Sequence, residues 1–342
     1  MKQAGSATLL FESRPYVLSA ASVAGKVEEQ GPYGHVFDEI MEDDRLGEKT
    51  FEKGERKMLL KALHRAVSRV GLPMEEAGCF LAGDLLNQIV TASYAARELA
   101  LPYLGLYGAC STMTEALLLG ATLVDGGSRN RALCAACSHF STAERQYRFP
   151  LEMGTTAPPH AQRTVTGAGA VLLGDAPLLH TGYRHIRLEA ATLGRVMDLG
   201  ITDANNMGAA MAPAAFDTIA RHLKDRDMEA DAFDWIITGD LGHFGSRMLR
   251  ELWKEADLDM GGRHLDCGSL IFSPEQKYHS GGSGCGCSAI LLAGYVLPQL
   301  ERGAVKRVLF LSTGALMSPL SACQGESIPG IAHAVSLVYE DM

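Results

Sequence analysis

Short apolar runs alternate with stretches of helical periodicity along most of the chain. The runs at 79–83, 103–108 and 131–138 have the length and composition of buried strands. Between them, the segments 87–99 and 111–124 have the pattern of helices packed on a core. Regular alternation of strands and helices predicts a layered α/β fold with a parallel sheet.

A polar segment precedes this region. Between Lys26 and Met58 the sequence holds ten acidic and six basic residues, and glycines and a proline open the segment. We expect it to be an excursion on the surface. From Glu48 onward apolar residues recur every three or four positions until Gly71 and Pro73, which predicts a helix packed on a core.

The chain also repeats itself. The segment 79–87 is echoed by 235–243, and in both a Gly-Asp-Leu triplet follows an apolar run. The segment 108–111, an apolar helix and a strand from 131 are echoed by 286–288, a second apolar helix and a strand from 306. Both pairs occur in the same order, with an extra loop between 242 and 284. The sequence therefore predicts an internal duplication.

Composition narrows the class of protein. Of the 342 residues 47% are hydrophobic and 21% charged, which is typical of globular domains and excludes disordered and fibrous chains. The formal net charge is −9 and the pI about 5.7, so the chain has no overall basic field for nucleic acid. We expect no nucleic-acid partner.

Targeting signals and membrane spans are not expected. The N-terminal residues lack the basic start and long apolar stretch of a secretory signal. Two nearly uncharged runs, 99–124 and 280–300, are interrupted by glycines, and the first also by a proline, so we interpret each as a turn that leads into a buried helix. The eight cysteines then indicate thiols in a reducing, intracellular setting.

Neither a metal nor a cofactor is expected. Cys134 and Cys137 lie in one predicted strand, where alternation places their side chains on opposite faces. Cys285 and Cys287 have no second Cys or His pair at zinc spacing. The glycine-rich segment 281–287 lacks the lysine and the spacing of a phosphate-binding loop.

The Gly-Ala-Cys-Ser turn at 108–111 and the segment 166–174 resemble the thiolase and ketoacyl-synthase superfamily, with Thr166 where aspartate is usual. This resemblance implies duplicated α/β layers: two similar halves, with mixed five-stranded sheets and helices between and outside them. The halves are expected at 1–176, with the polar insertion near 26–58, and at 177–342. It also implies a homodimer.

Within that superfamily the chain is similar to the stage V sporulation protein AD family. The similarity lies in segments 47–58, 80–88, 105–112, 143–150, 209–215 and 279–288. The resemblance implies binding of dipicolinic acid (pyridine-2,6-dicarboxylate), free or as a calcium chelate. It further implies support of dipicolinate movement across the inner membrane of the forespore or spore during sporulation and germination, together with membrane proteins of the same operon. The chain would be soluble or peripheral at that membrane.

Cys110 is the strongest candidate nucleophile, because a thiol at a helix N-terminus is favoured as a thiolate. In the superfamily the cysteine at this place carries the acyl group. The alternative is that a small residue fills a buried turn. Condensation by the superfamily also needs a histidine, whose usual position here falls near Gly239 or Asp240, and a second polar residue, where this chain has Cys285. We predict that the condensation chemistry is lost.

A pocket at the ends of the duplicated strands remains as the predicted binding site. Its expected lining, if the strand ends converge, is Asp84, Asn87, Cys110, His139, Asp240, His243, His279, Cys285 and Cys287. The two aspartates could instead cap the turns that follow, and each histidine could be an ordinary buried or surface residue.

Three arginines, Arg145, Arg148 and Arg163, follow a strand that ends near this pocket and could bind carboxylates, or could be solvated. A net charge of −9 repels a dianion at long range, so local groups must hold it.

Two alternative functions remain. The chain could be an acyltransferase in which Cys110 takes an acyl group with help from His243 or His279, or a structural scaffold that docks membrane partners through the segment 26–58.

Overall fold

A computed structural model describes residues 1–147, 158–178, 182–258 and 260–341. Five strands of the first half belong to its main sheet, and five of the second half follow them. The first set is β3 (Tyr16–Ala24), β5 (Phe80–Gly83), β6 (Tyr103–Gly105), β7 (Arg131–Ser138) and β9 (Gly167–Gly174). The second set is β10 (Ile186–Thr192), β11 (Trp235–Thr238), β12 (His264–Asp266), β14 (Arg307–Ala315) and β15 (Gly330–Tyr339).

Both sets have the same topology. The sheet runs β12-β11-β14-β15-β10-β3-β9-β7-β5-β6, so from the centre outward each half reads first, fifth, fourth, second and third in chain order. The central strands β3 and β10 pair through Arg187 and Tyr16. This mirrored order confirms the duplication that the sequence predicts.

The sheet is mixed, whereas strand and helix alternation alone predicts a parallel one. β5 pairs in parallel with β6 and β7, but β9 is antiparallel to β7 and to β3. The chain leaves the end of β7 and returns to the sheet at that same end, so β9 must run in the opposite direction. The second half repeats this arrangement, with β15 antiparallel to β14.

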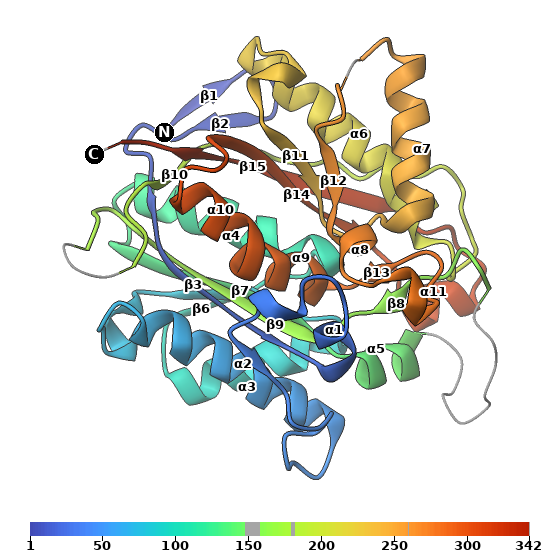
Figure 1. Ribbon diagram of the computed structural model, residues 1–342, viewed down its shortest axis with the longest axis horizontal. Helices are drawn as coiled ribbons and strands as arrows, with labels where there is room; N and C mark the ends of the chain where they lie inside the picture. The colour runs from blue at the N-terminus through green and yellow to red at the C-terminus, as the bar shows by residue number, and fades with distance from the viewer. Residues whose placement is uncertain (148–157, 179–181, 259, 342) are drawn as a thin grey trace.

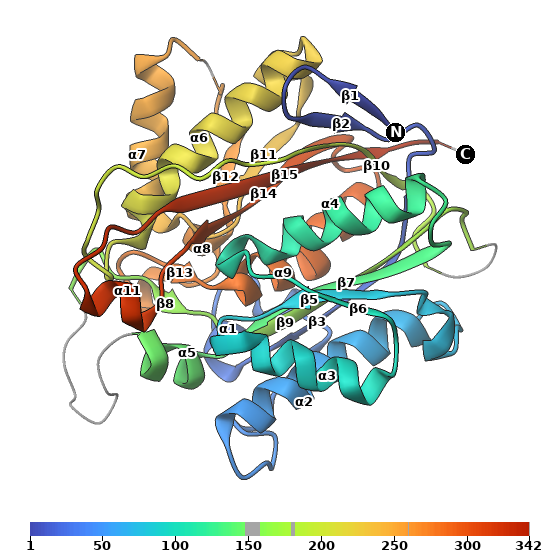
Figure 2. The same ribbon diagram turned by 180° about the vertical axis from the view of Figure 1, so that it is seen from behind.

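Helices form three layers around the two halves of the sheet (Figures 1 and 2). One outer layer holds α2 (Phe51–Ser68) and α3 (Val90–Leu99). The central layer holds α4 (Thr112–Asp125), α9 (Cys285–Leu291) and α10 (Leu297–Glu301), and a π-helical turn, η8 (Leu292–Val296), joins the last two. The other outer layer holds α6 (Met207–Arg226) and α7 (Gly242–Glu255). Buried apolar side chains fill three clusters between these layers and the sheet.

Smaller elements lie around this frame. The strands among them are β1 (Lys2–Ala4), β2 (Thr8–Leu10), β4 (Glu39–Ile40), β8 (Arg163–Thr164) and β13 (Gly282–Ser283). The α-helices are α1 (Lys26–Glu29), α5 (Phe140–Tyr147), α8 (Cys267–Leu270) and α11 (Pro319–Cys323). The 3-10 turns are η1 (Gly34–Val36), η2 (Met74–Ala77), η3 (Asn87–Ile89), η4 (Ala109–Ser111), η6 (Ala230–Ala232) and η7 (Pro274–Gln276). The predicted extra loop of the second half contains α8, η7 and β13.

The polar segment near 26–58 is less superficial than predicted. Glu28 is 1% exposed, and one of its carboxylate oxygens accepts a hydrogen bond from the backbone N–H of Thr166 at 3.0 Å. Glu55 is fully buried and accepts a hydrogen bond from the hydroxyl of Thr142 at 2.8 Å. The helix predicted from Glu48 onward is α2, which begins at Phe51 within this segment, and the side chain of Thr50 caps it. Two carboxyl groups of a nominally surface segment therefore belong to the interior.

The predicted helix at 87–99 is interrupted. Gln88 and Ile89 have φ values of 59° and 44°, so the regular helix α3 begins only at Val90. Positive φ is costly for a β-branched residue and marks local strain. The carboxylate of Asp84 holds this turn, because it accepts hydrogen bonds from the backbone N–H groups of Leu86 and Ala92, both at 2.8 Å. Asp84 thus caps the turn, as one of the two sequence interpretations proposes.

Other predicted features can be located directly. Cys134 packs in the central cluster and Cys137 in the cluster under α2, so the two side chains do lie on opposite faces of β7. The predicted boundary between residues 176 and 177 falls between β9 and β10 and stays a prediction. In the part of the chain that the structure describes, no helix is both long and apolar enough to cross a membrane.

Candidate functional site

Cys110 lies in η4, directly before α4. The preceding residue, Ala109, has a φ of 49°, so a strained turn presents the cysteine at the start of the buried helix. The hydroxyl groups of Ser111 and Thr112 donate to the carbonyl oxygens of Gly108 and Ala109 at 2.7 and 2.6 Å and fix this turn. Cys110 is 5% exposed, and that exposed edge faces a pocket.

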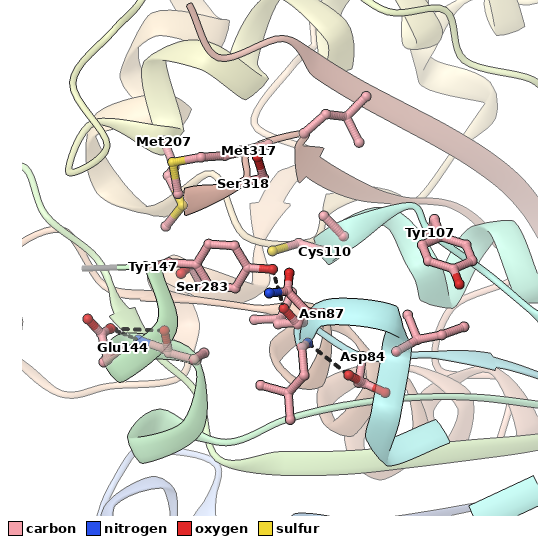
Figure 3. A pocket seen from close by; sticks show the side chains of 18 of the residues that line it. Asp84, Asn87, Tyr107, Cys110, Glu144, Tyr147, Met207, Ser283, Met317 and Ser318 are labelled. Carbon is pink, nitrogen blue, oxygen red and sulfur yellow. Dashed lines mark hydrogen bonds between the residues drawn. The ribbon is translucent and has the colours of Figure 1, made fainter. Parts of the chain in front are cut away.

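The pocket has a volume of about 550 Å³ and lies where strands of both halves end (Figure 3). The first half contributes the turn after β5, the turn before α4 and part of α5. The second half contributes the end of β14, α11, β13 and the first residue of α6. Its polar lining is Asp84, Asn87, Gln88, Tyr107, Glu144, Tyr147, Thr164, Ser283, Ser318 and Ser321. The wall is thus a mixture of hydroxyl, amide, carboxyl and apolar groups.

Asp240 lies next to Cys110 at the end of β11. The carboxyl group of Asp240 is close enough to the thiol of Cys110 to raise the pKa of that thiol. The same carboxylate accepts from the hydroxyl of Thr313 at 2.6 Å and from the backbone N–H of Gly284 at 2.9 Å. Complete burial raises the pKa of Asp240 to about 7. Residues of the two repeats therefore meet, and the predicted neighbourhood of Cys110 and Asp240 is observed.

The thiol of Cys110 is held in its protonated form. Burial and the nearby carboxylate of Asp240 raise its pKa well above the usual value for cysteine. The helix N-terminus favours the thiolate, as the sequence analysis assumes, but these two effects outweigh it here. The structure thus places Cys110 correctly for a nucleophile but in an environment that suppresses nucleophilicity.

Cys285 and Cys287 turn away from the pocket. The thiol of Cys285 donates to the carbonyl oxygen of Cys137 at 2.8 Å, because the start of α9 packs directly against β7. Cys287 is fully buried in the central cluster. Neither residue is part of the described pocket lining. The glycine-rich loop therefore delivers no polarising side chain from these two positions.

None of the three candidate histidines is part of the described pocket lining. His139 is 1% exposed; its Nε2 donates to the carbonyl oxygen of Asp44 at 2.7 Å, and its Nδ1 accepts from the backbone N–H of Ser141 at 3.1 Å. Burial lowers the pKa of His139. His243 lies on the solvent side of α7, and His279 is exposed in the loop before β13. The expected convergence of all nine residues is therefore not what the structure has, because strand ends fix backbone positions and not side-chain directions.

Asp84 and Asn87 line the pocket together with Cys110, whereas Asp240, which was also predicted there, is not part of the described lining. Asp84 is 3% exposed, and burial raises its pKa to about 6. Its oxygens are occupied by the turn that it caps. Asn87 is exposed at the pocket wall, beside Tyr147 (Figure 3).

The arginines expected near the pocket have other contacts. Arg145 forms an ion pair with Glu52, and the guanidinium of Arg163 lies over the rings of Phe140 and Tyr278, at 3.7 and 4.7 Å from their centres. Arg148 lies outside the described residues. The described lining contains the carboxyl groups of Asp84 and Glu144 but neither Lys nor Arg.

Several lining residues were missed by the sequence analysis. Tyr147 reaches into the pocket from α5, and its hydroxyl donates to the carbonyl oxygen of Leu85. Met317 and Ser318 follow β14, which is the repeat equivalent of β7. The repeat itself was the available signal, because strand ends that are equivalent in a duplication lie at the same edge of the fold. No comparable signal pointed to Tyr147 or Ser283.

The state of the Cys110 thiol can be tested chemically. Since the thiol is buried and its pKa is raised, we expect alkylation of Cys110 by iodoacetamide at pH 8 to be at least about tenfold slower in the folded protein than in urea. Mass spectrometry of the modified peptides measures both rates. Equal rates in the folded and unfolded protein would contradict the assigned protonation state.

The mirrored sheets, the buried helix pair and the cysteine at the start of α4 define a thiolase-like protein. Solved structures of thiolase-like proteins have the same fold. A cerulenin-bound OleA from Xanthomonas campestris has a TM-score of 0.61 at 14% identity and covers 97% of this chain and 98% of its own. Human mitochondrial 3-ketoacyl-CoA thiolase in complex with CoA gives 0.59 at 15% identity, with 96% and 99% covered. The expected fold class is confirmed.

The chain belongs to the stage V sporulation protein AD family. The family model for stage V sporulation protein AD matches residues 5–338. Stage V sporulation protein AD from Bacillus subtilis (strain 168) is 45% identical over 335 residues, which cover 98% of this chain and 97% of that protein. The chain is thus a sporulation protein with the fold of condensing enzymes.

Proposed function

We propose that this protein binds dipicolinic acid in the pocket beside Cys110 without making or breaking a covalent bond, and that it supports the movement of dipicolinate across the spore inner membrane. Membrane-embedded proteins encoded in the same operon would be its partners. The protein would act from the membrane surface. The alternative of a thioester-using acyltransferase rests on the position of Cys110 at the N-terminus of α4.

The observation that carries this proposal is the buried carboxyl group of Asp240 beside the thiol of Cys110. Condensation needs groups that stabilise a negatively charged enolate, and Asp240 does the reverse once it is ionised above its pKa of about 7. The neighbouring Cys285 thiol is turned to the carbonyl oxygen of Cys137. A pocket of about 550 Å³ nevertheless remains beside the thiol. A cavity without condensing groups suits a binding protein.

The lining favours a planar ligand whose charge is neutralised. The ring of Tyr147 projects into the pocket, where it can stack on a pyridine, and Asn87 and Ser283 offer hydrogen-bond donors (Figure 3). The carboxyl groups of Asp84 and Glu144 lie in the same wall, and the described lining provides no cationic side chain. A free dianion would be repelled there, so the calcium chelate of dipicolinate is the better fit.

Isothermal titration tests the proposal. We expect heat with dipicolinate, stronger binding when calcium is present, and no heat with pyridine-2-carboxylate. Tyr147→Ala should weaken binding about tenfold, because it removes the stacking ring, and Tyr147→Phe should retain most of it. Cys110→Ala, titrated beside the wild type, reports whether the thiol touches the ligand. Absence of heat with dipicolinate, or equal heat with the monocarboxylate, would rule the proposal out.

A homodimer is proposed across β6. This strand ends the sheet and therefore presents unpaired backbone groups. Exposed apolar side chains surround it: Tyr94 is 45% exposed, Leu104 47% and Tyr107 64%. A second copy related by a two-fold axis would cover both features.

Leu104→Asp is expected to convert this dimer into a monomer, because a charge would then be buried at the centre of the interface. Multi-angle light scattering measures the mass. Leu199→Asp is the matched control, since Leu199 is 60% exposed on a different part of the chain and should leave the dimer intact. A wild-type protein of monomer mass would refute the dimer.

A further inference from the structure

The outer helix α7 carries a row of basic side chains on its solvent face. The row consists of His243, Arg247, Arg250 and Lys254, and all four side chains are exposed. They are spaced by four, three and four positions, so they share one face of the helix over about 16 Å. We call this row the basic stripe. α7 lies in the outermost layer, at the upper right in Figure 1.

The basic stripe lacks the acidic partners that another basic helix has. Ion pairs are formed by four basic residues of α2 and by Arg69 directly after it, with acids that include Asp38, Glu39 and Glu48 of the preceding polar segment. The four are Arg56, Lys57, Lys61 and Arg65. Among the described residues, no ion pair joins an acid to Arg247 or Arg250. Lys254 has one contact, with Glu251 at 3.9 Å, and both of those side chains are highly exposed.

Like charges therefore face one another along α7. Burial, and then the charges of Arg247 and Arg250, lower the pKa of His243. The protein as a whole carries a net charge of −9, so this row is a local exception to an acidic surface. The same helix also carries the exposed acids Glu251 and Glu255, so the repulsion that remains is mainly between Arg247 and Arg250. An anionic partner would relieve that repulsion.

A groove of about 530 Å³ lies at the C-terminal end of the basic stripe. Trp253, Leu258 and Met260 supply its apolar surface, while Arg250, Lys254 and one acid, Asp257, stand at its rim. Trp253 and Met260 are only 3% and 6% exposed, so most of each side chain is packed against the rest of the protein. An apolar hollow edged by cations fits an apolar side chain with acidic neighbours.

We propose that the basic stripe and this groove bind an acidic segment of a partner protein, with one apolar or aromatic residue of that segment lying against Leu258 in the groove. A protein partner fits better than a lipid surface. None of the large apolar side chains that are exposed in the described part of the chain lies on α7, so the helix has nothing to insert into a bilayer. This site is separate from the pocket beside Cys110 and does not depend on what that pocket binds.

A labelled peptide tests the proposal on the full chain. The probe is a short fluorescein-labelled peptide of aspartate and glutamate with one central phenylalanine, and its binding is followed by anisotropy. The double variant Arg247→Glu with Arg250→Glu should weaken binding about tenfold or more, because it replaces two attractions by two repulsions. Replacing the phenylalanine of the peptide by serine should also weaken binding about tenfold.

The charge-matched control is Lys53→Glu with Lys224→Glu, two exposed lysines on α2 and α6 without ion pairs among the described residues. It should bind the peptide like the wild type. Equal losses of peptide affinity in both double variants would overturn the proposal. Equal affinity for the phenylalanine and serine peptides would overturn it as well. Binding of phosphatidylglycerol vesicles that is lost on reversal of Arg247 and Arg250, without peptide binding, would assign the stripe to a membrane instead. Circular dichroism checks that each variant is folded.

Discussion

Replacing Asp266 with alanine is expected to lower the free energy of unfolding by about 3–5 kcal/mol. The carboxylate of Asp266 is almost fully buried and accepts four hydrogen bonds. The donors are the hydroxyl of Thr238 at 2.7 Å and the backbone N–H groups of Leu241, Gly242 and Ser269 at 2.8, 2.8 and 2.9 Å. Alanine leaves three backbone donors buried without an acceptor, and each costs about 1–3 kcal/mol.

Urea unfolding followed by circular dichroism measures this effect. Asp266→Asn keeps one acceptor oxygen and should cost clearly less than alanine. Asp231→Ala is the matched control, because Asp231 is exposed and its loss should change stability by less than about 0.5 kcal/mol. A midpoint for Asp266→Ala that coincides with the wild type would show that the carboxylate does not hold the loop between β11 and α7. That loop also carries Asp240, so dipicolinate binding should fall with it.

Asp240→Asn is expected to gain stability relative to the wild type as the pH rises from 5 to 8, by about 2 kcal/mol. Burial raises the pKa of Asp240 to about 7 in the folded protein, from a usual value of 3.8. A raised pKa means that the folded state binds the proton more tightly than the unfolded chain does. The stabilisation from the neutral carboxyl is therefore complete below pH 3.8 and is lost as the pH passes through 7.

The comparison isolates one group, because every other titrating residue is shared by the two proteins. Urea unfolding at a series of pH values gives the difference in free energy directly. Asp231→Asn should show no such drift, since its side chain is exposed. A difference between Asp240→Asn and the wild type that stays constant with pH would mean that Asp240 is already ionised at pH 5. In that case the thiol of Cys110 would lie beside a permanent carboxylate.

Much of the fold could be predicted from local pattern. The apolar run at 131–138 coincides with β7, and the repeated Gly-Asp-Leu triplets mark the ends of β5 and β11. The repeats also placed Cys110 and Asp240 at one edge of the fold, where their side chains are neighbours. The positions of the backbone could be predicted because short-range periodicity in the sequence marks both the strands and the turns that repeat.

Side-chain direction could not be predicted in the same way. Cys285 lies at the expected edge, yet its thiol donates to the carbonyl oxygen of Cys137 because α9 packs on β7. The break at Gln88 and Ile89 depends on hydrogen bonds to Asp84, and no periodicity signals them. Tyr147 enters the pocket only through the way in which α5 packs. Contacts between segments that are distant in the sequence decide all three features: the direction of the Cys285 thiol, the break before α3 and the position of Tyr147.

Mass spectrometry of the intact protein tests most directly whether the pocket binds a ligand without chemistry. The protein is incubated with dipicolinate and calcium or, separately, with acyl-CoA, and each sample is sprayed under native and then denaturing conditions. We predict a mass gain of one dipicolinate with its calcium under native conditions that disappears on denaturation, and no adduct from acyl-CoA. An acyl adduct that survives denaturation and is absent in Cys110→Ala would contradict the account and establish an acyltransferase.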